Sequence, residues 1–579
     1  MALLGVAALV LGYQAVEART ALVNAAARFE EVGVHLRLGH AAAARDAVQE
    51  ARREARHADR MTGGLLWGLA TRAPVLGDDM EAVRTVAQVA RGLADNVLMQ
   101  VVTASEELDP ARLRPRDGRV DLGPLVRVRD EVVAADRELQ WLASRAGGID
   151  TASLVPQLAE PVSRLQHELS EAATVSSRAS YAVRLLPPML GNKGPRTYLV
   201  LFQNNAEMRA TGGIPGAVAV MRAENGRVTI ESQGTVADLG FQEVVATSLT
   251  DEELALYGTR LLTYGADIGL TPDFPRVAEL AQARWLAVQG QHVDGVAATD
   301  PVALSYLLRA TGPVTLPDGS ALTASNAVDR LLSKVYLTQP DPDLQDLFFA
   351  GVARVIFRHA VDGSGDAEEM LEALTRAVEE GRLLVWSSRS EEQALLAETS
   401  LAGALPRESG PSPFVGVFLN DGTAAKMEYY LEHRVDVSSI ACDGGGRQRL
   451  ELRVTLTSRA PEDAAQLPES VIGDGETRDP GPRLPPGHMR LTVHVYAPVG
   501  GAIESFARDG RFAPLDVAEH LGHPVAAQTV DLAPGETHEL SYRLLSGPAQ
   551  PGRVSLRVTP GAHDGGIGTV GRSACRSAS

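Results

Sequence analysis

The sequence predicts a multidomain α+β protein: an N-terminal membrane helix with a helical stalk or bundle, a central α/β layered domain and a C-terminal β-sandwich. Three observations indicate this order. An apolar run opens the chain, a long region with helical spacing of apolar residues follows, and strand-like patterns dominate after Tyr198. With 579 residues, the chain is also too long for one hydrophobic core.

The composition excludes some classes of protein. The chain is 45% hydrophobic and 22% charged, which is typical of a folded protein. Its formal net charge of −18 leaves no electrostatic footprint for nucleic acid, so we expect no nucleic-acid partner. Lysine occurs at Lys193, Lys334 and Lys426 alone, so nearly all positive charge is arginine. Arginine richness of this kind follows high-GC codon usage and does not by itself indicate phosphate binding.

Residues 1–18 predict a membrane anchor. Every residue of Ala2–Gly12 is apolar or glycine, and Glu17 is the first charged residue. The run is short for a spanning helix, which needs about 20 residues. No basic residue precedes it, which suggests that a basic leader is missing from this sequence. A signal peptide cleaved after Ala18, with Val16 at the −3 position, and a buried soluble helix are the alternatives.

Residues 19–189 predict a helical stalk or bundle. The stretch is rich in alanine, arginine and glutamate, with apolar residues at helical spacing. Gly63-Gly64 and Pro74 interrupt the pattern, and Asp78-Asp79 suits the start of the next helix. Pro187-Pro188 is expected to end the last helix. Such a bundle would carry the rest of the chain away from the membrane.

Residues 190–405 predict an α/β layered domain. Tyr198–Phe202 is a continuous apolar run, the pattern of a strand buried on both faces. Asn225-Gly226 is a hairpin dipeptide between two further strands. From Pro272 to Trp386 helical and strand patterns alternate, which is typical of layered α/β domains.

Residues 406–579 predict a β-sandwich that is closed by a disulfide. Segments such as RLELRVTLT (449–457) and RLTVHVY (490–496) alternate apolar and polar residues, with Gly/Pro-rich turns between them. Cys442 precedes these strands and Cys575 follows them, and neither lies in a metal-binding pattern. Two cysteines in an exported protein predict one bridge. Closing a loop of more than about 100 residues would contribute about 4–5 kcal/mol in the chain-entropy model.

The first candidate ligand site follows the buried strand, in Gln203–Gly213. The segment combines an amide cluster, a carboxylate, an arginine fork that fits carboxylate or phosphate, and two glycines that permit close backbone approach. The alternative is that these side chains satisfy the backbone of a turn, while Arg209 pairs with Glu207 or Asp273. The candidate residues are Asn204, Asn205, Glu207, Arg209, Gly212 and Gly213.

A second group of candidates is Asp273, Arg284 and Asp294. Asp273 or Asp294 could act as a metal or base carboxylate beside Arg209, whereas helix capping is the simpler role for Asp273 before Pro275 and for Asp300. The sequence contains no GxSxG, P-loop or HExxH motif and no Rossmann GxGxxG between a strand and a helix, so we assign no catalytic residue and no metal site.

Four segments resemble a known bacterial family. LVLFQNNAEMRATGG (199–213), TPDFP (271–275), VDGVAATDPVALSYLLRATGPV (293–314) and NDGTAAKMEYYL (420–431) are similar to the family called domain of unknown function 4012. The apolar N-terminus, APVLGDD (73–79) and the terminal cysteine also fit. The resemblance implies the architecture above and no established activity.

The order of elements in the central domain is also similar to that of the LytR-CpsA-Psr phosphotransferases. Those enzymes attach polyprenyl-pyrophosphate-linked glycopolymers to the cell wall. The similarity implies that Arg209 would hold pyrophosphate and Asp273 would hold Mg²⁺. Two departures weaken it: Ser232–Thr235 replaces the family's second arginine-aspartate element, and Tyr336–Leu347 contains no arginine.

Two functional hypotheses follow. We favour a single-pass, membrane-anchored extracytoplasmic envelope protein that binds or scaffolds a cell-wall glycopolymer, a polyprenyl-linked precursor or an assembly partner, with cofactor and oligomeric state unspecified. The alternative is a Mg²⁺-dependent phosphotransferase acting on polyprenyl-pyrophosphate-linked glycans. The enzyme requires Arg209, a second arginine such as Arg284 or Arg196, and a carboxylate to converge at the mouth of an apolar pocket.

Overall fold

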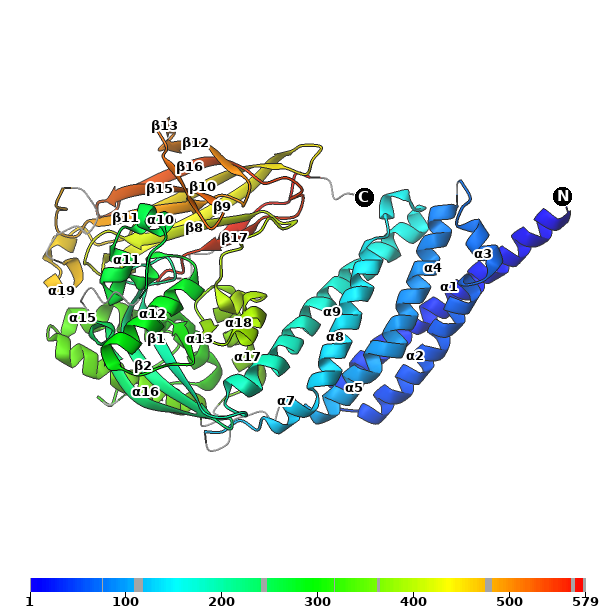
Figure 1. Cartoon of the computed structure of the whole chain (residues 1–579), viewed down its shortest axis with the longest axis horizontal. Coiled ribbons are helices and arrows are strands. Elements are labelled where there is room, and N and C mark those ends of the chain that lie inside the picture. The colour runs from blue at the N-terminus through cyan, green and yellow to red at the C-terminus, as the bar shows by residue number, and fades with distance from the viewer. Residues whose placement is uncertain are drawn as a thin grey trace. The chain divides into compact units, whose positions relative to one another are not determined.

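The computed structural model describes residues 2–74, 76–108, 118–240, 247–316, 318–361, 365–473, 482–563 and 568–575. The chain forms two compact units (Figure 1). The helical unit holds Met1–Arg114 and Val120–Asn192, and the sheet unit holds Pro115–Arg119 and Lys193–Ala578. The expected fold class is confirmed: a mixed α+β chain with an N-terminal apolar helix and several sheets toward the C-terminus. The finer domain boundaries stay predictions.

Long helices packed through alanine form the helical unit. Alanine side chains of α1, α2 and α4 are buried against one another, because the small side chain suits both helix formation and close approach. Pro187-Pro188 does not end the last helix as expected, because α9 runs on to Met189 and both prolines lie in its last turn. The elements are α1 (Ala2–Arg37), α2 (Ala41–Thr62), α3 (Leu65–Ala70), α4 (Gly77–Gly92), η1 (Leu93–Val97), α5 (Leu98–Glu107), α7 (Gly123–Arg127), α8 (Arg129–Gly147), η2 (Thr151–Ser153) and α9 (Pro156–Met189).

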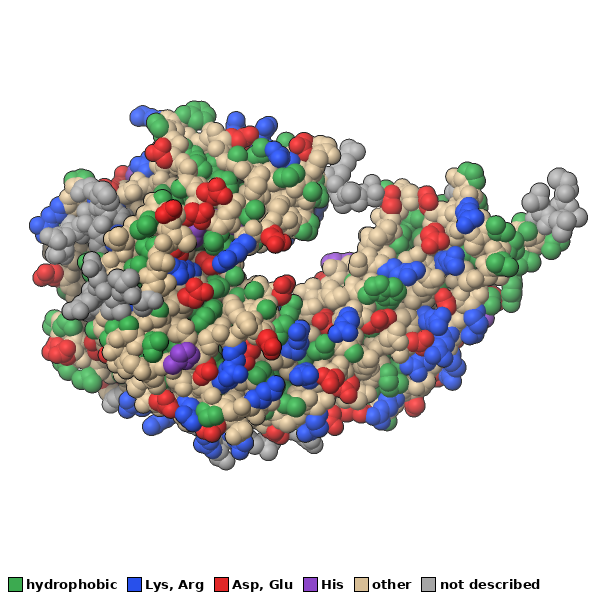
Figure 2. Space-filling view, in the orientation of Figure 1, with side chains coloured by type: hydrophobic (Ala, Val, Ile, Leu, Met, Phe, Trp, Pro, Cys, Tyr) green, Lys and Arg blue, Asp and Glu red, His purple; other side chains and the backbone are tan. Residues whose placement is uncertain are grey.

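Helix α1 begins outside the bundle and ends inside it. Val6–Arg37 is the one helix among the described residues that is long and apolar enough to cross a membrane. Val6, Leu9 and Val16 are exposed, whereas Ala18 is buried against the bundle. Hydrophobic side chains accordingly cover the N-terminal part of the helix in Figure 2. The helix is continuous through the segment that could have been a cleaved signal peptide.

The central sheet of the sheet unit is mixed and has the strand order β3-β2-β1-β4-β7. Strands β1 and β4 are parallel and the other neighbours are antiparallel. The turn between β2 and β3 is at Asn225-Gly226, both with positive φ, as the dipeptide predicts. The elements are β1 (Arg196–Asn204), β2 (Ile214–Glu224), β3 (Arg227–Thr235), η3 (Val236–Leu239), α10 (Asp251–Tyr257), α11 (Arg260–Thr263), η4 (Gly265–Leu270), α12 (Phe274–Gln289), β4 (Gly295–Thr299), α13 (Pro301–Thr311), β5 (Val314–Thr315), β6 (Ala321–Leu322), α14 (Ala327–Asp329), η5 (Arg330–Lys334), α15 (Val335–Thr338), α16 (Pro342–Val361), α17 (Ala367–Glu379), β7 (Leu384–Ser387), α18 (Ser390–Ala397) and η6 (Ser400–Ala402).

Helices cover both faces of this sheet. Leu199 and Leu201 of β1 pack in one hydrophobic cluster with α12. The alternate residues, Val200 and Phe202, face the opposite way, toward α13 and α16. Both faces of β1 are therefore apolar, which explains its continuous apolar sequence.

The rest of the sheet unit is a β-sandwich. Its two sheets, β14-β15-β11-β8-β17 and β13-β12-β16-β10-β9-β18, share one large hydrophobic core. Strand β8 is buried along its whole length. The elements are β8 (Phe414–Asp421), η7 (Met427–Tyr430), β9 (Leu431–Cys442), β10 (Gln448–Ser458), η8 (Ala464–Gln466), α19 (Glu469–Ile472), β11 (Met489–Tyr496), β12 (Ala502–Arg508), β13 (Arg511–Phe512), β14 (Val517–His520), β15 (His523–Leu532), β16 (Thr537–Leu545), β17 (Ser555–Val558) and β18 (Thr569–Val570).

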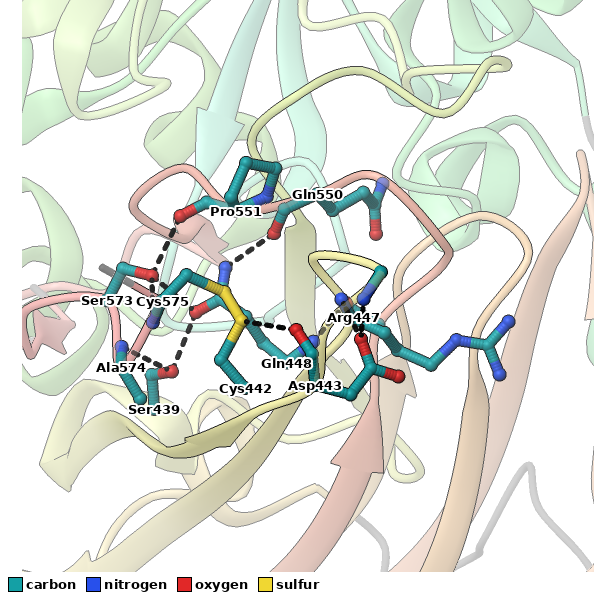
Figure 3. The surroundings of a disulfide bond; sticks show 12 residues. Ser439, Cys442, Asp443, Arg447, Gln448, Gln550, Pro551, Ser573, Ala574 and Cys575 are labelled. Carbon is teal, nitrogen blue, oxygen red and sulfur yellow. Dashed lines mark hydrogen bonds between the residues drawn. A yellow bond between two sulfur atoms is a disulfide. The ribbon is translucent and has the colours of Figure 1, made fainter. Parts of the chain in front are cut away.

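A disulfide joins Cys442 at the end of β9 to Cys575, which confirms the predicted pairing (Figure 3). The hydroxyl oxygen of Ser573 lies 2.8 Å from the carbonyl oxygen of Pro551 and 3.0 Å from Oε1 of Gln448, and its single proton can be donated to either. Strand β18 runs parallel to β9 just before the bridge. The disulfide therefore fastens the C-terminal segment to the edge of the sandwich.

Replacing both cysteines tests this fastening. Cys442→Ser with Cys575→Ser should lower the free energy of unfolding by up to about 4–5 kcal/mol, because the bridge restricts a long loop of the unfolded chain. Guanidinium denaturation measures the loss from the unfolding transition of the sheet unit. Reduction of the disulfide in the unmodified protein should shift the denaturation midpoint by the same amount. An unchanged midpoint would contradict the assignment.

Candidate functional site

The segment 205–213, which carried most of the predicted site, joins β1 to β2 and is buried inside the sheet unit. It lies against the end of β8 from the β-sandwich. The backbone N–H of Asp421 donates to the carbonyl of Met208 at 3.0 Å, and the N–H of Ala210 donates to Oδ1 of Asn420 at 2.8 Å. The hydroxyl of Thr559 also donates to the carbonyl of Ala210. The segment is therefore a junction between the central sheet and the sandwich.

Arg209 is completely buried in this junction, with 0% of its surface exposed. Its Nη2 is 2.8 Å from Oδ1 of Asp267, and its Nη1 donates to the carbonyl of Met208 at 2.7 Å. A second carboxylate, Asp421, lies 3.7 Å from Nη1. Burial alone would lower the pKa of Arg209, but the two carboxylates raise it overall. The partner is Asp267, and neither Glu207 nor Asp273 forms the expected pair.

A second buried carboxylate accompanies Asp421. Burial raises the pKa of Asp421 to about 6 and raises that of Glu428 well above its usual value. Neither carboxylate oxygen of Glu428 has a hydrogen-bond partner among the residues described. The negative charge of Asp421 adds to the effect of burial and raises the pKa of Glu428 further.

The two glycines serve the tight packing of the junction. Gly212 has a φ of +136°, a backbone conformation that residues with a Cβ atom rarely adopt. A Cβ atom on Gly213 would overlap the carbonyl group of Asn204. Their conformational freedom is thus used for chain folding at this turn.

Asp273 and Arg284 bind backbone groups elsewhere. Asp273 occupies the N-cap position of α12, as predicted, but its Oδ1 accepts from the N–H of Leu405 at 2.8 Å. The guanidinium of Arg284 donates to the carbonyls of Leu239 at 2.9 Å and Gly240 at 2.5 Å. Both side chains therefore hold loops in place, and they do not converge with Arg209.

Asp294 lies near the beginning of β1. Its Oδ2 accepts from the N–H of Thr197 at 2.9 Å, and its Oδ1 is 3.5 Å from Nη1 of Arg196. Arg196 itself pairs with Glu392 at 2.7 Å. This ion-pair group is at the end of β1 opposite to the junction, so the structure does not bring Arg196 or Asp294 to Arg209.

A cavity of about 410 Å³ lies beside the junction, between the central sheet and helices α13 and α16. This volume falls within the range of about 300–1,000 Å³ that is usual for small-molecule sites. Apolar side chains from three strands and three helical segments form its walls. They include Val200, Phe202, Ile214, Ala217, Ala219, Met221, Ile230, Leu304, Leu307, Leu331, Leu332, Phe349, Val352, Ile356 and Phe357.

Small residues on one face of β2 help to create this space. Ala217 and Ala219 point into the cavity, opposite Phe202 and Val200 of β1. The alternate residues of β2, Val218 and Val220, are larger and fill the other face of the sheet. The cavity therefore depends on the side-chain alternation of β2.

Polar groups gather at the end of the cavity next to the junction. The amide of Asn204 donates to the hydroxyl of Tyr336 at 3.1 Å and to Oε1 of Glu207 at 3.3 Å. The Nζ of Lys426 lies 3.1 Å from Glu207 and 4.8 Å from the ring centre of Tyr336. Asp300 also lines the cavity. We call Asn204, Glu207, Tyr336, Lys426 and Asp300 the polar end of the cavity.

Asp300 and Asn205 connect this end to the core. Asp300 caps α13 through the N–H of Ala303 at 2.7 Å, as predicted, and also pairs with Arg382 at 2.8 Å. The amide of Asn205 donates to the same carboxylate at 3.0 Å. Of the predicted residues, Asn204 and Glu207 thus line the cavity, Asn205 supports it, and Arg209 lies behind it in the junction.

Lys426 and Tyr336 were missed by the sequence reasoning. Lys426 lies in the NDGTAAKMEYYL segment and is one of three lysines in the chain, which is a usable signal. Tyr336 gives no such signal, because it belongs to a helical apolar pattern. Their contact with Glu207 brings together residues far apart in the sequence.

Comparison with known proteins finds a family similarity in the central region. Residues 193–336 match the family model described as Protein of unknown function (DUF4012). The match shows similarity to this family over that region. The DUF4012 match includes the junction, the three cavity-lining strands and α13, and it ends at Tyr336. No curated protein and no solved structure matches the chain.

Arg209→Leu tests whether Arg209 belongs to a structural ion pair. The change leaves Asp421 buried without a guanidinium and leaves Asp267 with Arg260 as its remaining partner, so the free energy of unfolding should fall by about 3–5 kcal/mol. The matched control is Arg222→Leu, which removes an exposed pair with Glu224 and should cost less than about 1 kcal/mol. Urea denaturation compares the two. Equal small losses would contradict the structural role.

Proposed function

We propose that this chain is a membrane-anchored, extracytoplasmic cell-envelope protein that binds the apolar chain of an amphiphilic, lipid-type ligand in the cavity of its sheet unit. The class of ligand that fits best is a polyprenyl- or lipid-linked envelope precursor. The observation that carries the proposal is the cavity of about 410 Å³ with apolar walls and one polar end.

The distribution of side chains favours an amphiphile over a wholly polar ligand. Strands β1 and β2 and helix α16 supply aliphatic and aromatic walls, which favour transfer of an apolar chain from water. The ammonium of Lys426 carries three N–H donors at the polar end and lies beside Glu207 and Tyr336. A ligand with an apolar chain and a compact polar head satisfies both regions.

The location rests on α1 and on the disulfide. Helix α1 is long and apolar enough to span a membrane. The Cys442–Cys575 bridge supports an oxidising, extracytoplasmic compartment for the sheet unit. An envelope glycopolymer or an assembly partner fits the same location.

The phosphotransferase alternative has less support from the site. The guanidinium of Arg209 is engaged by Asp267, and that of Arg284 is engaged by backbone carbonyls. Arg196 pairs with Glu392 at the far end of β1. A pyrophosphate clamp would need these donors at the mouth of the cavity. We therefore propose binding rather than transfer.

Ala219→Phe tests the cavity as the binding site. The ring should occupy the space of the apolar chain and weaken binding of a fluorescent polyprenyl phosphate by at least about tenfold, which corresponds to about 1.4 kcal/mol. Fluorescence titration of the full chain in detergent measures affinity. Partitioning of the probe into micelles is the same for every variant and cancels in the comparison.

Ala394→Phe is the matched control, because it adds the same ring to an exposed position on α18. Its affinity should equal that of the unmodified protein. The thermal midpoint of Ala219→Phe should not fall by more than a few degrees, since the cavity accepts the ring. Unchanged affinity in a folded Ala219→Phe protein would sink the proposal.

A further inference from the structure

The connection between α2 and α4 in the helical unit is almost free of charge. Residues 61–76 (MTGGLLWGLATRAPVL) contain one charged side chain, Arg72. Helix α3 lies within this connection and has only six residues. A helix of this length is not stable alone in water, so its position depends on packing.

One residue of α3 fixes it to the bundle while others face outward. Trp67 is buried, and its indole N–H donates to the carbonyl of Met80 in α4 at 3.0 Å. Leu65 is 92% exposed and Leu69 is 65% exposed, and Leu76 after the helix is exposed as well. The connection thus presents leucines on the surface of a folded, anchored element. Exposed leucines that cluster in this way indicate an interaction surface.

The place of α3 along α1 indicates what that surface meets. Gly64, immediately before α3, lies next to the side-chain amide of Gln14, and α3 is beside α1 in Figure 1. On the N-terminal side of Gln14, α1 exposes apolar residues such as Leu9, which is 76% exposed. On the C-terminal side, Ala18 is buried in the bundle. Helix α3 therefore lies at the level where the apolar part of α1 leaves the bundle.

We propose that α3 is an interfacial element, with Leu65, Leu69 and Leu76 inserted into the surface of the bilayer that α1 enters. The partner is the lipid bilayer itself, and the inference rests on the proposed membrane anchoring. Leucines next to an apolar helix leave water when they enter the acyl boundary. Arg72, also exposed, is suited to lipid phosphate.

Depth-dependent quenching tests the inference on the full chain. Both native cysteines are in the disulfide, so a single introduced cysteine can be labelled selectively with the fluorophore NBD. The labelled variants are Leu69→Cys on α3, Leu9→Cys on the anchor and Leu38→Cys as control. Leu38 is 61% exposed, a fraction similar to that of Leu69. It lies just past the C-terminal end of α1, about 36 Å along the helix axis from Gln14.

Each protein is reconstituted into phosphatidylcholine–phosphatidylglycerol vesicles, with nitroxide-labelled lipids as quenchers. Leu69→Cys should be quenched best by nitroxides close to the headgroup, with a blue shift of NBD emission, because α3 lies at the interface. Leu9→Cys should be quenched best by deep nitroxides, and Leu38→Cys should remain unquenched.

Quenching at Leu9 but not at Leu69 would overturn the interfacial role and leave the anchor in place. Quenching at neither position would overturn both the interfacial role and the proposed anchoring. Circular dichroism of each variant verifies that the helical unit remains folded.

Discussion

The polar segment between β1 and β2 must satisfy its backbone and charged groups without water, and the sheet unit is organised around this requirement. An unpaired buried charge or amide would cost several kcal/mol. Arg209 meets Asp267, and the backbone around Met208 and Ala210 bonds to the end of β8. These bonds hold the central sheet against the β-sandwich. Gly212 and Gly213 let the chain turn tightly enough for these hydrogen bonds and ion pairs to form.

The same segment supplies part of the candidate binding site. Glu207 belongs to the junction and also to the polar end of the cavity, next to Asn204 at the end of β1. Hydrogen bonds between this segment and β8 hold such groups in fixed positions, which is a property of preorganised sites. On β2, Ala217 and Ala219 are small and leave space on the cavity face of the sheet. The larger residues between and after them, Val218 and Val220, pack in the core on the opposite face. Fold stability and ligand space thus come from alternate residues of two neighbouring strands.

Local patterns predicted much of the fold, whereas long-range pairing determined the site. The hairpin at Asn225-Gly226 follows from backbone conformation, and the apolar sequence of β1 follows from burial on both faces. The partner of Arg209 could not be predicted, because Asp267 is 58 residues away in a short 3₁₀ segment without periodicity. Lys426 likewise reaches Glu207 from the region of the sandwich. A sequence pattern identifies unusual polar residues but not whether tertiary packing buries or exposes them.

Photo-crosslinking with a diazirine-bearing polyprenyl phosphate tests the central claim most directly, because it reports where the apolar chain lies. After irradiation of the full-length protein, peptide mapping identifies the modified segments. The account predicts modification of α16 around Phe349 and Phe357 and of β1–β2, and competition by unlabelled polyprenyl phosphate. Modification that is confined to α1, or spread over the surface without competition, would contradict a binding site in the cavity.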